Sequence, residues 1–327
     1  MMNKLTISLS PHIHSGDSIN RRMWNVVIAL LPALAVALWT FGLPALWVTL
    51  VSVGSCLLAE WLIARFLLHK PCTLSNGSAL ITGLLLAFNL PSILPLWMVA
   101  IGAIVAIGIG KMSFGGLGCN IWNPALVGRV FLLISFPAAM TTWPTGVSSA
   151  FNGFTGASTQ SDADTGATLL THLNSGDVSM ADYNVLDMAI GQMNGSLGEV
   201  GAFAILIGLA YLLITRTITW HIPVSILASA ALFSWAFGGN PVLDLLAGGL
   251  MLGAVFMATD YVTSPMTHSG QLLFGFMIGL ITIIIRKYGA YPEGVSFAIL
   301  LMNSFVPLIN RYFRPAIFGE KERRQTA

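Results

Sequence analysis

Charged residues are scarce in this chain of 327 residues. They make up 9% of the sequence, against roughly 25% in an ordinary soluble domain, whereas 55% of the residues are hydrophobic. This composition argues against a soluble globular domain and predicts a polytopic membrane protein. The net charge is only +2 and the basic residues are spread along the whole chain, so the charge pattern predicts no nucleic-acid partner.

Several motifs of redox and nucleotide enzymes are missing as well. The sequence has neither a GxGxxG after a strand nor a GxxxxGK, which excludes those routes to NAD or ATP. Its 3 cysteines, Cys56, Cys72 and Cys119, are far apart and form no CxxC pair. They predict neither a disulfide framework nor a complete set of iron–sulfur ligands. We interpret them as buried thiols, with a cluster shared with a partner protein as the alternative, and we expect no metal site and no catalytic residue of this chain's own.

Apolar runs predict about ten membrane segments, at approximately 23–41, 43–68, 77–90, 94–112, 121–137, 197–214, 221–239, 242–258, 270–286 and 294–313. A long polar stretch divides them into two sets of five. Because an odd number of crossings reverses the orientation of the second set, the pattern predicts an all-α fold of two inverted halves. The expected regions are an amino-terminal segment (1–22), a first half (23–137), a loop (138–196), a second half (197–313) and a tail (314–327).

The basic residues predict which side of the membrane each loop faces. Cytoplasmic loops retain Lys and Arg, whereas short translocated loops lack them. With the amino terminus inside, only Arg286 and Lys287 fall outside and Arg129 falls within a span. The loop 138–196 holds five acidic residues and no Lys or Arg, which also places it outside. We therefore expect a multi-pass protein of the bacterial cytoplasmic (inner) membrane, with both termini cytoplasmic and the loop external or periplasmic.

Gly and Pro interrupt the apolar runs in both halves. Asn76-Gly77 and Pro91 bracket about 13 residues, or roughly 20 Å of helix, which is too short for the ~30 Å hydrocarbon core. The stretch 114–124 contains three glycines, and 238–241 and 263–265 interrupt the second half. Broken backbone at membrane depth needs partners from protein or water. The breaks therefore predict a polar site between the halves. The alternative is that they are ordinary turns, one or two helical turns deeper in the membrane than the predicted segment boundaries indicate.

One motif in the external loop indicates a modification site. It reads Asp162-Ala163-Asp164-Thr165-Gly166-Ala167-Thr168. The small side chains of Gly166 and Ala167 would let the active site of another protein approach the hydroxyl of Thr168 closely. Taken alone, the motif favours a solvated turn in which Thr165 caps a helix.

The pattern Asp-x-x-Thr-Gly-Ala-Thr resembles the recognition sequence of the flavin transferase that esterifies the phosphate of FMN to the last Thr. Three further stretches, Ser10-Pro11-His12, residues 76–87, and Gly115 to Gly118 followed by Asn123-Pro124-Ala125, resemble the RnfD/NqrB family of ion-translocating electron-transport complexes. The similarity covers nearly the whole chain, and the short amino-terminal segment is more similar to the RnfD branch. The family pattern more often has Ser at the position of Thr165, so the hydroxyl is kept.

The resemblance implies FMN held covalently on Thr168 through a phosphoester, with Asp162, Thr165, Gly166 and Ala167 as the surrounding motif, and it also suggests a second, non-covalent flavin such as riboflavin. It further implies an Rnf-type complex that links ferredoxin and NAD to Na⁺ or H⁺ transport. The partners would be flavin and iron–sulfur subunits, together with a separate flavin transferase. The alternatives are an NqrB-like member of a quinone reductase, a cofactor-free channel or transporter, and a scaffold protein.

Two carboxylates are candidates for the ion pathway. Ions crossing the membrane need carboxylates or backbone carbonyls at depth, and Glu60 and Asp260 fall in or near predicted spans. Alternatively, each carboxylate pairs with a nearby base such as Arg65 or lies in headgroup water.

Overall fold

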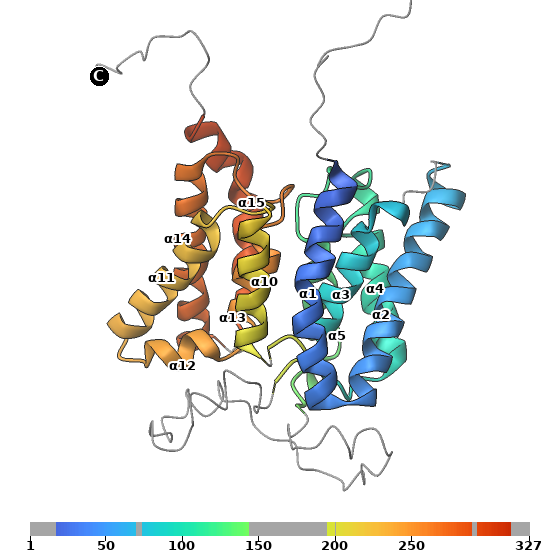
Figure 1. Ribbon diagram of the computed structural model, residues 1–327, viewed down its shortest axis with the longest axis horizontal. Coiled ribbons are helices and arrows are strands. Elements are labelled where there is room, and N and C mark those ends of the chain that lie inside the picture. Colours follow the sequence, from blue (N-terminus) through green and yellow to red (C-terminus); the bar gives the residue numbers. More distant parts are fainter. Residues whose placement is uncertain (1–17, 70–73, 144–194, 200, 290–292, 315–327) are drawn as a thin grey trace, which may run out of the picture.

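The computed structural model describes residues 18–69, 74–143, 195–199, 201–289 and 293–314. All regular elements within these ranges are helical, as the sequence predicts. The helices form two groups that stand side by side, the first built from α1 to α5 and the second from α10 to α15 (Figure 1). Helix α1 begins and α15 ends at the same end of the molecule (Figure 1). We call this the inner end, because the sequence predicts that it faces the cytoplasm, and the opposite end the outer end.

The first group contains α1 (Ile19–Phe41), α2 (Leu43–Leu62) with its π-helical extension η1 (Ile63–Leu67), the 3-10 turn η2 (Leu74–Asn76), α3 (Ser78–Phe88), α4 (Leu96–Gly108), the 3-10 turn η3 (Met112–Phe114), α5 (Pro124–Ser135) and α6 (Pro137–Met140). Ser18 caps α1 by accepting a hydrogen bond from the backbone N–H of Arg21. Gly42 ends α1 with a φ of 65°, a conformation that favours glycine, and this allows the tight turn into α2.

The second group contains α10 (Ala202–Ile214), α11 (His221–Ala236), α12 (Pro241–Leu246), α13 (Leu250–Leu252), the π-turn η5 (Gly253–Met257), α14 (His268–Tyr288) and α15 (Val295–Tyr312). Its packing order matches that of the first group. Helix α2 packs on α3 and α4, and α4 packs on α5; correspondingly, α11 packs on α12 and α14, and α14 on α15. A repeated packing order of this kind is what two related halves would have.

Five helices are long and apolar enough to cross a membrane: Ile19–Phe41, Leu43–Leu67, Leu96–Phe114, His268–Tyr288 and Val295–Tyr312. Four more are apolar but shorter: Ser78–Phe88, Pro124–Ser135, Ala202–Ile214 and His221–Ala236. The chain is therefore a polytopic membrane protein. Nine of the ten predicted runs correspond to these helices.

The tenth predicted run, 242–258, is not one continuous helix. The structure divides it into α12, α13 and η5, with Gly248 between α12 and α13 at a φ of 70°. The break leaves helix carbonyls without their usual partners. Arg286 of α14 compensates by donating hydrogen bonds to the carbonyls of Asp244 and Ala247. A side chain distant in sequence therefore stabilises this interruption.

The predicted breaks have two outcomes. In the first half, α3 has 11 residues, which is only ~16 Å of helix, and the backbone after η3 is irregular, with positive φ at Gly115, Gly116 and Gly118. These breaks are confirmed. The stretch 238–241 is instead an ordinary turn between α11 and α12, because Asn240 caps α12 and Pro241 is its first residue.

Small residues allow close approach of helices within each group. A Cβ atom on Gly279 of α14 would lie 2.8 Å from the carbonyl oxygen of Ile226 in α11. The hydroxyl of Ser225 donates to the carbonyl oxygen of Leu272 over 2.7 Å across the same contact. Such small-residue contacts stabilise helix pairs where lipid supplies no hydrophobic driving force.

Candidate functional site

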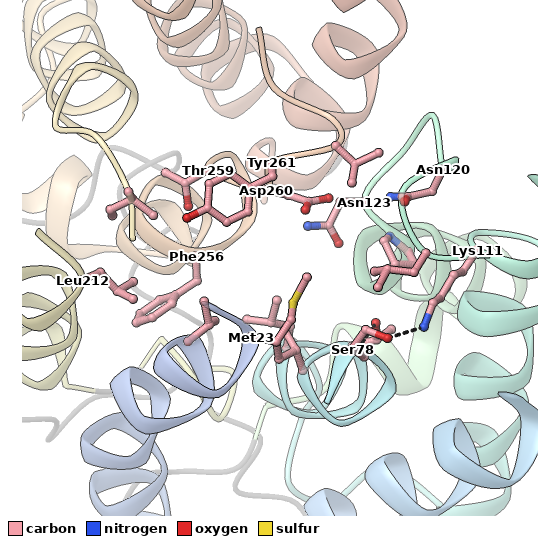
Figure 2. Close-up of a pocket in the computed structure, with 18 residues that line it drawn as sticks. Met23, Ser78, Lys111, Asn120, Asn123, Leu212, Phe256, Thr259, Asp260 and Tyr261 are labelled. Atoms are coloured by element: carbon pink, nitrogen blue, oxygen red, sulfur yellow. Dashed lines mark hydrogen bonds between the residues drawn. The ribbon is translucent and has the colours of Figure 1, made fainter. Parts of the chain in front are cut away.

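A pocket lies between the two helix groups near their inner end. Its walls come from α1, α3, α5 and the 111–123 segment of the first group and from α10, η5 and residues 259–262 of the second. The space measures about 780 Å³ with its open mouth included. In Figure 2, Ser78, Lys111, Asn120, Asn123 and Asp260 lie toward one side of the pocket, and Phe256 and Leu212 lie toward the other, together with Thr259 and Tyr261. The first side is polar, and the second is the more apolar of the two.

A buried ion pair forms one edge of the polar side. The Nζ atom of Lys111 lies 2.6 Å from Oε2 of Glu60 in α2 and donates to the hydroxyl of Ser78 at 2.7 Å. The exposed fraction is 3% for Lys111 and 1% for Glu60. Because both charges are buried, each depends on the other for compensation. Lys111 and Ser78 line the pocket, and Glu60 lies behind them.

Asp260 lies on the opposite edge of the polar side, beside Asn120 and Asn123 (Figure 2). Its Oδ2 atom accepts a hydrogen bond from the hydroxyl of Thr263 at 3.2 Å. Among the described residues, Asp260 forms no ion pair. This carboxylate therefore faces the pocket without a basic side chain to neutralise it.

Asn123 connects the two helix groups beneath the pocket. Its side-chain oxygen accepts a hydrogen bond from the backbone N–H of Ala125, which caps α5, and Pro124 follows as the first helical residue. Its Nδ2 atom donates to the carbonyl oxygen of Met257 at 3.2 Å, across to η5. The side-chain amide of Asn123 therefore caps a helix of one group and donates a hydrogen bond to the π-turn of the other.

The structure brings the two predicted ion-pathway residues to one site. Asp260 lines the pocket, whereas Glu60 pairs with a base, as the alternative predicted, although that base is Lys111 and not Arg65. The position of Lys111 at the pocket was not predicted from the sequence. The one available signal was its position between a long apolar run and a glycine-rich stretch.

The motif residues Asp162, Thr165, Gly166, Ala167 and Thr168 lie outside the described residues. Of the cysteines, Cys56 is buried as expected, whereas Cys119 is exposed, so the expectation of a buried thiol is wrong there; Cys72 lies outside the described residues. The described part of the chain contains no group of three His, Cys, Asp or Glu that could hold a metal ion.

The sequence matches the family described as NQR2, RnfD, RnfE over residues 6–319. The chain belongs to this family. The resemblance inferred from the motifs is thereby confirmed. Segments that resemble the family also converge on the pocket, since Ser78, Ile81 and Leu85 come from 76–87 and Leu117 from the glycine-rich stretch.

Similar members of the family match over nearly their whole length. The D component of the Na⁺-translocating ferredoxin:NAD⁺ oxidoreductase complex of Acetobacterium woodii is 45% identical over 324 residues, which cover 99% of this chain and 98% of that protein. The D component of the proton-translocating ferredoxin:NAD⁺ oxidoreductase complex of Clostridium ljungdahlii is 41% identical, with coverage of 98% and 97%. The corresponding component of the ion-translocating oxidoreductase complex of Stutzerimonas stutzeri is 40% identical, with 94% of each chain covered.

Proposed function

We propose that this chain is the RnfD component of an ion-translocating ferredoxin:NAD⁺ oxidoreductase, a redox-driven pump that moves Na⁺ or H⁺. The observation that carries the proposal is identity above 40% along almost the full length of two relatives with that activity in their names. One of these relatives is named for Na⁺ and the other for protons, so both ions remain candidates here. The chemistry of ferredoxin and NAD belongs to partner subunits with flavin and iron–sulfur centres.

The proposal includes FMN bound to Thr168 by a phosphoester on the external side of a bacterial cytoplasmic membrane, with both termini in the cytoplasm. Its support is the motif Asp162-x-x-Thr165-Gly166-Ala167-Thr168 and the lack of Lys and Arg in 138–196. A phosphate tether leaves the isoalloxazine ring conjugated, so the flavin supplies the redox chemistry while the protein supplies its position.

The intact mass of the purified protein tests the covalent flavin. We expect the mass of the chain plus one FMN less one water, and a yellow fluorescent band that persists after denaturation. Thr168→Val should abolish both, whereas Thr171→Val, a matched change three residues later in the same loop, should leave them unchanged. A wild-type chain with the bare polypeptide mass would contradict the covalent flavin and would favour the cofactor-free transporter or scaffold.

We also propose that the inner pocket holds a non-covalent flavin such as riboflavin. The apolar side, with Phe256, suits a flat ring system. A second space of about 770 Å³, mouth included, adjoins it through Ile218, Thr259 and Tyr261 and has a polar lining that suits a polyol chain. The lining residues of this second space are Arg22, Arg216, Thr217, Ile218, Thr219, Ile222, Thr259, Tyr261, Ser264 and Gln271. A small number of polar groups around an apolar cavity is the usual composition of a cofactor site.

A bulky side chain in the pocket tests this flavin. Ile81→Trp should fill the space and remove one equivalent of the flavin that denaturant extracts from the complex, while the covalent band on Thr168 remains. Ile104→Trp on α4 provides the control, because Ile104 is exposed and does not line the pocket. Undiminished extractable flavin in Ile81→Trp would assign that flavin to another place.

Asp260 is the stronger of the two candidates for binding the transported ion. A carboxylate that forms no ion pair within the described ranges can compensate a cation, whereas Glu60 is already compensated by Lys111. We therefore assign Asp260 to contact with Na⁺ or H⁺, and Glu60 to holding Lys111 at the edge of the pocket.

A further inference from the structure

A second group of buried charges lies at the outer end of the seam between the helix groups. Arg129 of α5 forms an ion pair with Glu293, two residues before α15, so this contact joins the two groups. Arg129 also donates to Oδ1 of Asn89 at 2.9 Å. Glu199 is buried nearby and interacts electrostatically with both Arg129 and Arg286. The proposed electron transfer and the inner pocket use none of these side chains.

The segment 195–199 closes the seam at this point. The backbone N–H of Leu197 donates to the carbonyl oxygen of Leu90 at 3.2 Å, and that of Gly198 donates to Phe88 at 2.7 Å. A Cβ atom on Gly198 would lie 2.5 Å from that of Phe88, so the two backbones are in close contact. The turn is held by Glu199, whose Oε2 accepts from the backbone N–H of Ser196 at 3.1 Å. The segment therefore holds the carboxylate of Glu199 beside the two arginines.

Several buried polar atoms of this group lack a hydrogen-bond partner within the described part of the chain. They are Nε of Arg129, Nε of Arg286, Oε1 of Glu293 and Oγ of Ser296. Buried polar atoms without partners are costly, and each one requires an explanation. Donors and acceptors left open in one place suit a small polar guest such as water or a hydrated cation.

One turn of α3 connects the inner pocket with a residue that contacts this group of charges. Leu85 of α3 lines the pocket, and Asn89 follows four residues later, roughly 6 Å along the helix. The amide of Asn89 links the two sites, because its Nδ2 donates to the carbonyl oxygen of Leu85 at 2.6 Å and its Oδ1 accepts from Arg129. Asn89 therefore connects Arg129 with the backbone of a residue that lines the pocket.

We infer that Arg129, Glu199, Arg286 and Glu293 form the outer closure of a route for a monovalent cation along the seam. Glu199 and Glu293 supply the carboxylates that the cation contacts. Arg129 blocks the route, because its guanidinium is paired with the carboxylate of Glu293 and its positive charge repels cations. The inference rests on the proposed function, since it assigns the route to a component of an ion-translocating complex.

Passive ion flux tests the closure without electron donors. The purified complex is placed in vesicles that contain a Na⁺-sensitive or a pH-sensitive dye, and a gradient of the matching ion is applied. Arg129→Gln should raise the flux of one of the two ions about tenfold or more, since a factor of ten corresponds to only about 1.4 kcal/mol of barrier. Glu293→Gln should leave passive flux at the wild-type level and slow ion uptake driven by ferredoxin oxidation, because Arg129 then lacks its counter-charge.

The different responses of the two variants separate a closure from general damage. Lys287→Gln, which removes an exposed cation one residue from Arg286, is the control and should match the wild type in both assays. Equal leakage in Arg129→Gln and Glu293→Gln would overturn the inference, as would wild-type flux in an assembled Arg129→Gln complex. If Arg129→Gln does not assemble, unchanged driven uptake in Glu293→Gln overturns it. Passive flux needs neither flavin nor ferredoxin, so this result is independent of the mass test for Thr168.

Discussion

Replacing Lys111 by methionine removes the ammonium group that contacts Glu60 and Ser78 inside the first helix group. Lys111 lies 2.6 Å from the carboxylate of Glu60, and both side chains are almost completely buried. Methionine has a similar length and no charge, so the change deletes the ion pair with little change in volume. The remaining carboxylate of Glu60 then lies in the protein interior without the cation of Lys111.

Removing one partner of a buried ion pair typically costs about 3–5 kcal/mol, whereas replacing both partners by uncharged groups is often close to neutral. We therefore expect Lys111→Met to lower the free energy of unfolding by about 3–5 kcal/mol. Glu60→Gln should also destabilise, because it leaves the ammonium of Lys111 buried. The double variant should be more stable than the sum of the two single losses predicts, with a coupling energy of about 2–3 kcal/mol.

The measurement is a double-mutant cycle on the purified protein in mixed micelles, unfolded by increasing SDS and followed by tryptophan fluorescence. Arg65→Met on η1 serves as the control, because Arg65 is an exposed cation near the same end of α2. Single changes that add to within about 0.5 kcal/mol would refute the reasoning, since residues without interaction are additive to that extent.

Three further outcomes follow from the packing and the pocket. Gly83→Ala should lower the free energy of unfolding by about 1–3 kcal/mol, because its Cβ would lie 2.7 Å from Cα of Val53. Gly54→Ala should not lower it, because nothing lies within 4 Å of that position. Unfolding by SDS measures both variants. In the same assay, Asn123→Ala should lower the free energy of unfolding by about 2 kcal/mol, because it removes a helix cap and the hydrogen bond to Met257. Asn240→Ala removes only a helix cap and should lower it by about 1 kcal/mol. Asp260→Asn should raise the concentration of the transported ion needed for half-maximal ferredoxin:NAD⁺ activity in the complex, and an unchanged ion dependence would exclude Asp260 from the ion site.

Local signals in the sequence were sufficient for the class of fold and for most helices. The short α3 could be predicted because Asn76-Gly77 and Pro91 act on the backbone next to them. The division of 242–258 could not, because the run is apolar throughout and the partner of its freed carbonyls, Arg286, lies about 40 residues further along the chain. Local composition contains no information on such a contact.

The same distinction applies to the candidate site. Glu60 and Asp260 could be predicted as candidates for the ion pathway because carboxylates are rare in apolar runs. Their surroundings could not be predicted from the sequence. Lys111 lies 51 residues beyond Glu60, and the pocket that Asp260 lines exists only where the two helix groups meet. The proposed attachment motif around Thr168 rests on sequence resemblance, because these residues lie outside the described ranges.

Several of the charged side chains at membrane depth lie beside the seam between the two helix groups. At the inner end, Lys111 and Asp260 line the pocket, and at the outer end Arg129 pairs with Glu293 across the groups. Charged side chains at membrane depth are costly, so their presence needs a compensating role. Purely structural charges could lie anywhere that two helices touch. Their position at both ends of one seam instead favours a role in moving charge along it, which is what a redox-driven ion translocase requires.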